Sequence, residues 1–318
     1  MAARPSSLLE LRPRAGQDSF TALAERVEAK RDELDQALLS SGALLIRGFA
    51  LEATEQFAEL VSRLAGAKEL REYRGGASPR HALPGSGAPV YNSTEYPAHV
   101  ELPLHNELSY AADYPERIYF MCLVEPDTGG ETTYGDSRRI LRAIPATVLS
   151  RFERLGVRYV RNLPPGEGSG YSWQDAFRSA DPYVVEQRCA ASGATAEWLP
   201  GDFLRVVQDR PAVAVHPQTG EEVWFNQADG FHPSALDEQS RQELLALYGS
   251  EDRFRLNVTF GDGSPIDPEG LAAVRAVVRQ ESRPHAWCKG DVLVLDNMLA
   301  AHGRRPFTGA RRIVTAIT

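Results

Sequence analysis

The chain has 318 residues, of which 42% are hydrophobic and 25% charged, an ordinary globular composition that can bury a sizeable core. Its 35 basic and 43 acidic side chains give a formal net charge of −8, which argues against nucleic acid or an anionic membrane surface as a partner. The three cysteines lie far apart and form no C-x-x-C pair, so we expect neither a disulfide framework nor a thiolate metal site.

The N-terminal residues and the apolar runs of the chain indicate where in the cell the protein is expected. The N-terminal residues lack an apolar core long enough for a signal peptide, and no run of about 18 apolar residues predicts a membrane span. With an odd number of widely spaced cysteines, these features predict a soluble protein of the reducing cytoplasm.

In the N-terminal part, helical periodicity alternates with short apolar runs. Residues 18–41 and 53–65 read as amphipathic helices on either side of a buried strand at 43–48. The stretch 70–101 is rich in Gly, Pro, Ser and Arg and reads as an irregular loop, and 118–124 (IYFMCLV with Ile118 first) is strongly β-prone.

In the C-terminal part, a helix is expected over 138–155, and the aromatic, glycine-rich stretch 162–200 has no clear period. The strands expected beyond it are 203–207, 212–215, 222–225, 291–295 and 312–317, and the helices are 239–248 and 269–280. This order predicts a mainly β core with helices packed outside, not alternating βαβ units. We predict one domain over 1–318, with an insertion or lid at roughly 162–200.

The stretch LPLHNELSYA, at 102–111, holds His105 and Glu107 two positions apart. On a strand, side chains two apart point to the same face, so this pair can present two metal ligands. Together they are half of the triad of two histidines and one carboxylate used by non-haem Fe(II) oxygenases. An exposed histidine beside a solvated glutamate is the alternative interpretation, and a third ligand is needed to decide.

The segment DNMLAAHGRRPF, at 296–307, offers that third ligand. We predict an apolar strand that leads into a turn carrying His302, followed by a second strand that starts at Arg311 and Arg312. An arginine there can hold the distal carboxylate of a dicarboxylate co-substrate. The alternative interpretation is that the two arginines lie at a strand end exposed to solvent and bind no ligand.

These motifs, with GGET at 129–132 and GARRI at 309–313, resemble the taurine dioxygenase and clavaminate synthase-like family of Fe(II)/2-oxoglutarate dioxygenases. The resemblance covers roughly residues 40–318 and implies a double-stranded β-helix (jelly-roll) core. The iron ligands that it implies are His105, Glu107 and His302.

The same resemblance implies the co-substrate contacts. Thr132 would hydrogen-bond the carboxylate of 2-oxoglutarate, and Arg312 would pair with its distal carboxylate. Arg311 is the competing choice, because adjacent strand residues face opposite ways and the register is open. Tentative substrate contacts, each with a loop or core role as the alternative, are Arg80, Asn92, Thr94, Glu95, Trp224, Asn226 and His232.

The resemblance implies an enzyme that hydroxylates an unactivated C–H bond of an amino acid or amino-acid derivative in natural-product biosynthesis. Fe(II), 2-oxoglutarate and O2 would be used, succinate and CO2 released, and no catalytic residue beyond the metal site is expected. A carrier-bound substrate, a homo-oligomer, and desaturation or cyclisation instead of hydroxylation stay open. The alternatives are a catabolic dioxygenase acting on sulfonates or other small carboxylates, a zinc hydrolase, and a non-catalytic binding protein.

Overall fold

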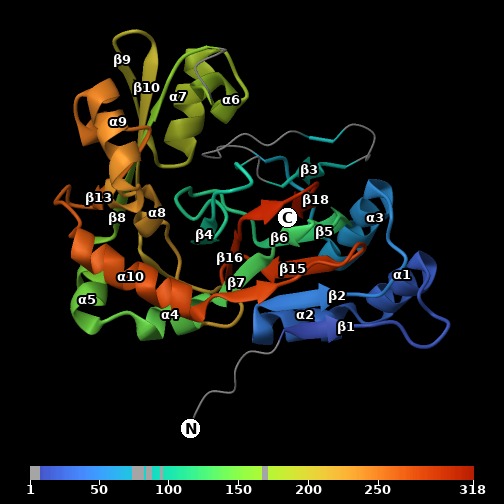
Figure 1. Cartoon of the computed structure of the whole chain (residues 1–318). Helices are drawn as coiled ribbons and strands as arrows, with labels where there is room; N and C mark the ends of the chain where they lie inside the picture. The colour runs from blue at the N-terminus through green and yellow to red at the C-terminus, as the bar shows by residue number, and fades with distance from the viewer. Residues whose placement is uncertain (1–7, 74–81, 84–87, 94–95, 167–170) are drawn as a thin grey trace.

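The computed structural model describes residues 8–73, 82–83, 88–93, 96–166 and 171–318. Two sheets form the centre of the molecule (Figure 1). The larger has the strand order β1 (Leu9–Leu11), β2 (Ala43–Ile46), β15 (Val292–Asp296), β5 (Arg117–Val124), β18 (Arg312–Ile317) and β3 (Tyr91–Asn92). The smaller has the order β14 (Arg283–His285), β7 (Thr132–Asp136), β16 (Ala300–Arg304) and β4 (Leu102–His105).

Alternation along the strands of the larger sheet divides the core into two layers. On β5, Phe120 and Cys122 belong to the hydrophobic cluster shared with the smaller sheet, whereas Tyr119 and Met121 belong to the cluster shared with the N-terminal helices. Because both faces are covered, the strand reads as an uninterrupted apolar run. This arrangement confirms the predicted jelly-roll core with helices outside.

The N-terminal helices cover the outer face of the larger sheet. They are α1 (Phe20–Ala29), α2 (Arg31–Ser41) and α3 (Thr54–Ala65). The prediction of one helix over 18–41 was wrong, because Lys30 leaves the helical region at φ −121° and ψ 19°. Arg31 then donates from Nε to the carbonyl of Arg63 at 3.1 Å, which ties the start of α2 to α3.

The predicted helix over 138–155 is likewise two helices, α4 (Ser137–Ala143) and α5 (Ala146–Leu155). Pro145 separates them: a residue before proline avoids the helical region, and Ile144 is extended with ψ 131°. Helix α10 (Pro268–Glu281) packs on α4 and places Leu271 and Val274 in the core between the sheets.

A third sheet stands beside this core, in the order β13 (Leu256–Phe260), β8 (Val157–Leu163), β10 (Phe203–Arg210) and β9 (Thr195–Leu199) (Figure 1). The stretch 162–200 contributes α6 (Trp173–Phe177), α7 (Pro182–Ala191) and β9, and it forms a separate hydrophobic cluster together with β10. That this stretch acts as a lid stays a prediction. The remaining elements are β6 (Thr128–Gly129), β11 (Val213–Val215), β12 (Glu222–Trp224), α8 (Ala228–Phe231), η1 (Pro233–Ala235), α9 (Glu238–Tyr248), η2 (Glu251–Arg253) and β17 (Phe307–Thr308).

Within the described residues, the helices are too short or too polar to cross a bilayer.

Candidate active site

Three side chains with metal-binding chemistry meet at the edge of the smaller sheet. His105 on β4 is paired with His302 on the antiparallel neighbour β16. Glu107 follows in the turn after β4, and its Oε2 lies 3.7 Å from Nε2 of His302. One ligand atom from each residue lies within 4.8 Å of the others, close enough for the three to share an ion.

The structure differs from the sequence prediction in two details of this cluster. β4 ends at His105, so Glu107 lies in a turn and not further along the strand. His302 lies inside β16 and not in a turn. The backbone turns after His105, with Leu108 at φ 54°, and this turn, not strand alternation, brings the carboxylate to the imidazoles.

Two buried asparagines hold the turn that carries Glu107. Asn297 accepts from the amide of Glu107 at 2.7 Å and donates to the carbonyls of Glu107 and Pro115 at 2.9 and 2.8 Å. Asn106 donates to the carbonyl of Asn297 at 2.6 Å and to Oγ of Ser137 at 3.1 Å. Both asparagines are shielded from water, which strengthens these bonds. Both also stand inside the quoted motifs, Asn106 between two predicted ligands and Asn297 five positions before the third, and this was a signal that the sequence analysis did not use.

Tyr73 holds the carboxylate itself. Its hydroxyl donates to Oε1 of Glu107 at 2.7 Å in a buried environment, and its amide donates to the hydroxyl of Tyr91 at 3.0 Å. With Oε1 held in this way, Oε2 is the oxygen on the side of His302. The sequence analysis missed Tyr73, because no motif marks a residue 34 positions before its partner.

The two imidazoles are suited to metal ligation. Nδ1 of His105 lies 2.9 Å from the carbonyl oxygen of Pro103, which can only accept, so this nitrogen carries the proton and Nε2 keeps a lone pair. In the described part of the chain, the buried Nδ1 of His302 has no hydrogen-bond partner, so the protein does not fix the proton of this ring. Two imidazole nitrogens and a carboxylate oxygen form a donor set that fits Fe(II).

A pocket beside His302 presents a buried cation. Thr132 on β7 and Arg311, just before β18, line it together with His302. Nε of Arg311 donates to the carbonyl of Gly130 at 2.9 Å, and its Nη2 lies 3.5 Å from Oγ1 of Thr132. Burial lowers the pKa of Arg311 to about 10, so the guanidinium is protonated at neutral pH and favours an anionic ligand.

Arg312 does not line this pocket. Its side chain is exposed at the start of β18, and the pairing of β18 with β5 shifts register between Arg312 and Ile313. Such a bulge breaks the alternation of side chains, so counting positions in the sequence could not separate the two arginines. The structure brings Arg311, and not Arg312, to Thr132 and His302.

Trp287 orients the hydroxyl of Thr132. The indole Nε1 donates to Oγ1 at 3.0 Å, and both side chains are buried. Because Oγ1 accepts this bond, its own proton is left to donate to a ligand oxygen. Trp287 stands edge-on to His285, with ring centroids 4.7 Å apart, and Nε2 of His285 lies 3.5 Å from Asp291. The sequence analysis missed Trp287.

Gly129 of the GGET motif allows a close strand pairing just before β7, the strand that carries Thr132. Gly129 has φ 69°, and a Cβ built there would lie 2.2 Å from the carbonyl oxygen of Pro306. Only glycine allows β6 and β17 to pair this closely, immediately before β7 enters the smaller sheet.

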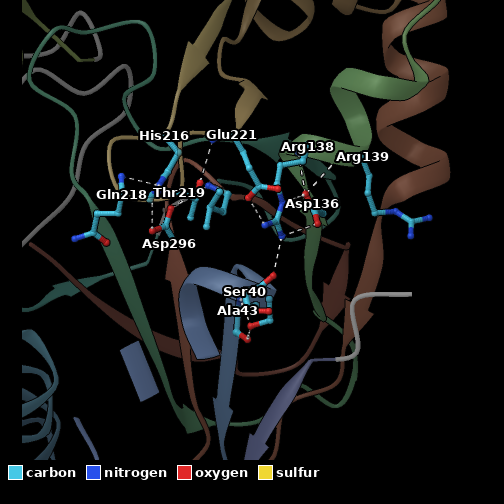
Figure 2. A network of polar contacts seen from close by, with 12 residues as sticks. Ser40, Ala43, Asp136, Arg138, Arg139, His216, Gln218, Thr219, Glu221 and Asp296 are labelled. Atoms are coloured by element: carbon cyan, nitrogen blue, oxygen red, sulfur yellow. Dashed lines mark hydrogen bonds and ion pairs between the residues drawn. The ribbon is translucent and has the colours of Figure 1, made fainter. Parts of the chain in front are cut away.

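A polar network centred on Asp296 and Arg138 holds the turn between β15 and β16 (Figure 2). One oxygen of Asp296 accepts from the amides of Met298 and Leu299 at 3.0 Å each, and the other lies 3.1 Å from Nε2 of His216. Nδ1 of His216 accepts from the amide of Thr219 at 3.1 Å, so the ring proton is on Nε2 and faces Asp296. The β11–β12 hairpin thereby fixes the turn that positions Asn297 against Glu107.

Arg138 is the second centre of the same network (Figure 2). Its guanidinium forms ion pairs with Asp136 at 2.9 Å and Glu221 at 2.8 Å, and it donates to the carbonyl of Ser40 at 3.0 Å. These contacts join α2, the end of β7 and the β11–β12 hairpin, so the network serves as a structural support for the smaller sheet.

Comparison with known proteins assigns the chain to a family. The model of the "Taurine catabolism dioxygenase TauD, TfdA family" matches residues 7–318. The chain belongs to this family. It is an Fe(II)- and 2-oxoglutarate-dependent dioxygenase, as the motifs of the sequence predicted.

Two curated relatives cover most of the dioxygenase. The dapdiamide synthesis protein DdaC of Enterobacter agglomerans is 36% identical over 284 residues, which are 89% of this chain and 84% of that protein. A clavaminate synthase-like protein of Arabidopsis thaliana is 30% identical over 311 residues, 94% of this chain and 88% of that protein.

Solved structures of PvcB share the fold. One, from Pseudomonas aeruginosa, has a TM-score of 0.55 at 20% identity and covers 99% of this chain and 86% of its own. Another, described as an Fe, alpha-ketoglutarate dependent oxygenase from an isonitrile synthetic pathway, has a TM-score of 0.52 at 18% identity, with 97% and 84% covered.

The residues predicted as substrate contacts fall into three groups. Arg80, Thr94 and Glu95 lie outside the described residues. Asn92 is half-buried on β3, where it pairs with Val314 of β18.

The third group, Trp224, Asn226 and His232, makes packing and capping contacts. Trp224 meets Phe152 edge-to-face with ring centroids 5.1 Å apart, Asn226 donates to the carbonyl of Ala212 at 2.8 Å, and the side chain of His232 caps η1 by accepting from the amide of Ser234. These contacts agree with the core and loop roles given as the alternative, and a substrate contact by any of the three stays a prediction.

Gln227, in the same stretch, reaches the active-site turn instead. Its Nε2 donates to the carbonyl of Asn106 at 2.8 Å and to Oγ of Ser109 at 3.2 Å. It therefore adds a third amide side chain to those that hold the turn of Glu107.

Proposed function

We propose that this dioxygenase hydroxylates an unactivated C–H bond of an amino acid or amino-acid derivative, free or carrier-bound, in the biosynthesis of a natural product. The observation that carries the chemistry is the placement of Arg311 and Thr132 in one pocket with His302. The biosynthetic setting is supported by DdaC, whose name assigns it to dapdiamide synthesis, and by PvcB, which is described as part of an isonitrile pathway.

In this proposal His105, Glu107 and His302 hold the iron. When bound, Fe(II) with 2-oxoglutarate and O2 supplies the oxidising chemistry, and succinate and CO2 are released. Support comes from the mutual distances of the three ligand atoms and from the hydrogen bond that leaves Nε2 of His105 unprotonated. Tyr73 keeps the carboxylate of Glu107 in one orientation.

Arg311 and Thr132 bind 2-oxoglutarate in the same proposal. The buried guanidinium pairs with the distal carboxylate, and the hydroxyl proton that Trp287 leaves available on Thr132 is donated to the same end of the molecule. This proposal prefers Arg311 to Arg312, whose side chain is exposed and does not line the pocket beside His302.

A cation near the turn of Glu107 supports an amino-acid-like substrate. Arg161 on β8 is 6% exposed, and its guanidinium lies 5.4 Å above the ring of Tyr110, three positions after Glu107. Tyr110 packs on Phe231 with ring centroids 5.0 Å apart. An arginine held over an aromatic surface suits a substrate with a carboxylate and an apolar side chain.

The test is an assay of succinate release with Fe(II) and 2-oxoglutarate. Candidate amino acids are supplied free or as thioesters on a carrier protein. We expect at least one to increase succinate release and to gain an oxygen atom, detected by mass spectrometry. Preferential stimulation by taurine or another sulfonate would instead support the catabolic alternative. Hydrolysis with zinc and without 2-oxoglutarate would contradict the proposal.

We also place the enzyme in the cytoplasm. Its cysteines form no disulfide in the structure: Cys122 and Cys189 are buried thiols, and Cys288 is exposed. Unpaired thiols are typical of a reducing compartment.

A further inference from the structure

A cavity of about 480 Å³ lies on the third sheet. Its walls come from the ends of β8 and β9, the start of β10, the end of α9 and the residues before β13. No residue of the metal cluster or of the Arg311 pocket contributes to it. Its size is that of a small-molecule site, roughly 300–1,000 Å³.

One wall of this cavity is apolar. It includes Leu199, Pro200 and Phe203 from the β9–β10 hairpin and Leu247 and Tyr248 from the end of α9. Leu247 lines the cavity and is 71% exposed, so its side chain is open to a ligand from solvent. This wall offers contact area to an apolar ligand.

The other wall carries an excess of positive charge. Arg205, Arg253 and Arg255 line the cavity, against the single acidic lining residue Asp252. Asp252 is already engaged, because its carboxylate lies 3.6 Å from Nη2 of Arg205. Nε of Arg205 also donates to Asn162 at 3.0 Å. Arg253 and Arg255 form no ion pair within the described residues, although the chain as a whole is acidic.

Arg255 has a hydrogen-bond donor without an acceptor. One of its terminal nitrogens donates to the carbonyl of Tyr171, and the guanidinium lies 5.5 Å above the ring of the same residue. Its Nε is buried and has no partner among the described residues. Burial also lowers the pKa of Arg255, as expected for a cation that lacks a counter-charge. The buried Nε without an acceptor, and a half-buried guanidinium without an acidic partner among the described residues, both favour an anionic ligand.

We infer that this cavity binds an organic anion, with a carboxylate or phosphate against Arg255 and Arg253 and an apolar body against Phe203 and Leu247. The cavity shares no lining residue with the Arg311 pocket or with the metal cluster. The inference therefore does not rest on the proposed function.

Two fluorescent probes of nearly the same shape test the inference directly. 8-Anilino-1-naphthalenesulfonate is an anion with an apolar body, and N-phenyl-1-naphthylamine is the same body without the sulfonate. Each is titrated into the full-length protein with Mn(II) and saturating 2-oxoglutarate, so that the Arg311 pocket is filled. We expect the anion to bind roughly tenfold or more tightly than the neutral probe.

Variants of the lining arginines show whether the anionic probe binds in this cavity. Arg255→Gln is expected to weaken the anionic probe roughly tenfold and to leave the neutral probe unchanged, and Arg253→Gln to weaken it less. Arg255→Lys should keep part of the affinity, because the charge stays. The matched control is Arg158→Gln: Arg158 is on β8, three positions before Arg161, and pairs with Asp209 outside the cavity. Thermal unfolding shows whether each variant is folded. If Arg255→Gln does not fold, the probe affinity of Arg253→Gln decides whether the anion binds in this cavity.

Displacement of the anionic probe identifies the acidic group. Octanoate that competes better than octyl phosphate indicates a carboxylate ligand, and the reverse order indicates a phosphate. Equal affinity for the two probes would overturn the inference. So would unchanged affinity for the anionic probe in Arg253→Gln together with Arg255→Gln, because the anion would then bind elsewhere.

Discussion

His302 lies opposite His105 across the β16–β4 pair, with ring centroids 4.4 Å apart. The pairing brings together residues that are almost two hundred positions apart in the sequence. Because β16 also pairs with β7, the strand that carries Thr132, one sheet positions both the metal cluster and the co-substrate pocket.

Arg311 and Arg312 form a natural pair of test and control. Arg311→Gln should raise the Kd for 2-oxoglutarate by roughly tenfold to a hundredfold, because a buried charge-assisted pair is lost. Arg312→Gln should leave the Kd unchanged, because that side chain is exposed. The measurement is anaerobic titration of the Fe(II) enzyme with 2-oxoglutarate. A larger effect from Arg312→Gln would reverse our assignment of the distal carboxylate.

Trp287→Phe tests the orientation of the Thr132 hydroxyl. The variant keeps an aromatic ring beside His285 but removes the indole donor to Oγ1. We expect a several-fold increase in the Kd for 2-oxoglutarate, consistent with about 1 kcal/mol for one hydrogen bond. Affinity for the metal alone should not change. Equal weakening of metal and 2-oxoglutarate binding would mean that Trp287 supports the whole sheet and not this one hydroxyl.

Tyr73→Phe tests the support of the carboxylate ligand. Removal of the hydroxyl that donates to Oε1 of Glu107 should lower the affinity for Fe(II) about tenfold to a hundredfold, as for other residues that orient metal ligands. Tyr183→Phe, at an exposed tyrosine of α7, is the control and should have no effect. Metal affinity is measured by competition with a chelator. If Tyr73→Phe binds Fe(II) as tightly as the parent protein, the hydrogen bond has no role in ligation.

Asp229 predicts a pH dependence of stability. Burial of its side chain in α8 raises the pKa of Asp229 to about 6, with Arg275 opposing the shift. The folded state thus binds this proton more tightly than the unfolded state, where the pKa is near 3.8. Stability from this group is therefore present below about pH 4 and is lost as pH rises through about 6.

Asp229→Asn removes that titration. Relative to the parent, the variant should gain on the order of 2 kcal/mol of unfolding free energy at pH 8, and little at pH 4. Urea unfolding at both values measures the difference. A variant that is equally stable, or less stable, at pH 8 would show that Asp229 is charged and satisfied in the folded protein.

Much of the fold could be read from the sequence where the apolar pattern was long. Helices α3, α9 and α10 and strands β5, β15 and β18 all lie within a residue or two of the predicted ranges. Strand β16, with the sequence AAHGR, was not predicted, because it has no apolar run of its own. Its conformation is set by pairing with β7 and β4, which is a property of the assembled sheet.

The candidate site, too, could be predicted from the sequence only in part. The ligand cluster was visible as short motifs, because each ligand is part of a recognisable run of residues. Tyr73 and Trp287 were missed, because each is a single aromatic residue that reaches the site only through tertiary packing. The bulge after Arg312 could not be read either, because a shift of one position leaves no mark in residue type.

The most direct test of the central claim is an anaerobic titration of the metal-free protein, first with Fe(II) and then with 2-oxoglutarate, followed by visible absorption. We predict a metal-to-ligand charge-transfer band in the parent protein and its loss in His302→Gln, which keeps the volume of a side chain that is only 4% exposed. Absence of the band in the parent, or its persistence in His302→Gln, would contradict the assignment of His105, Glu107 and His302 as the iron site.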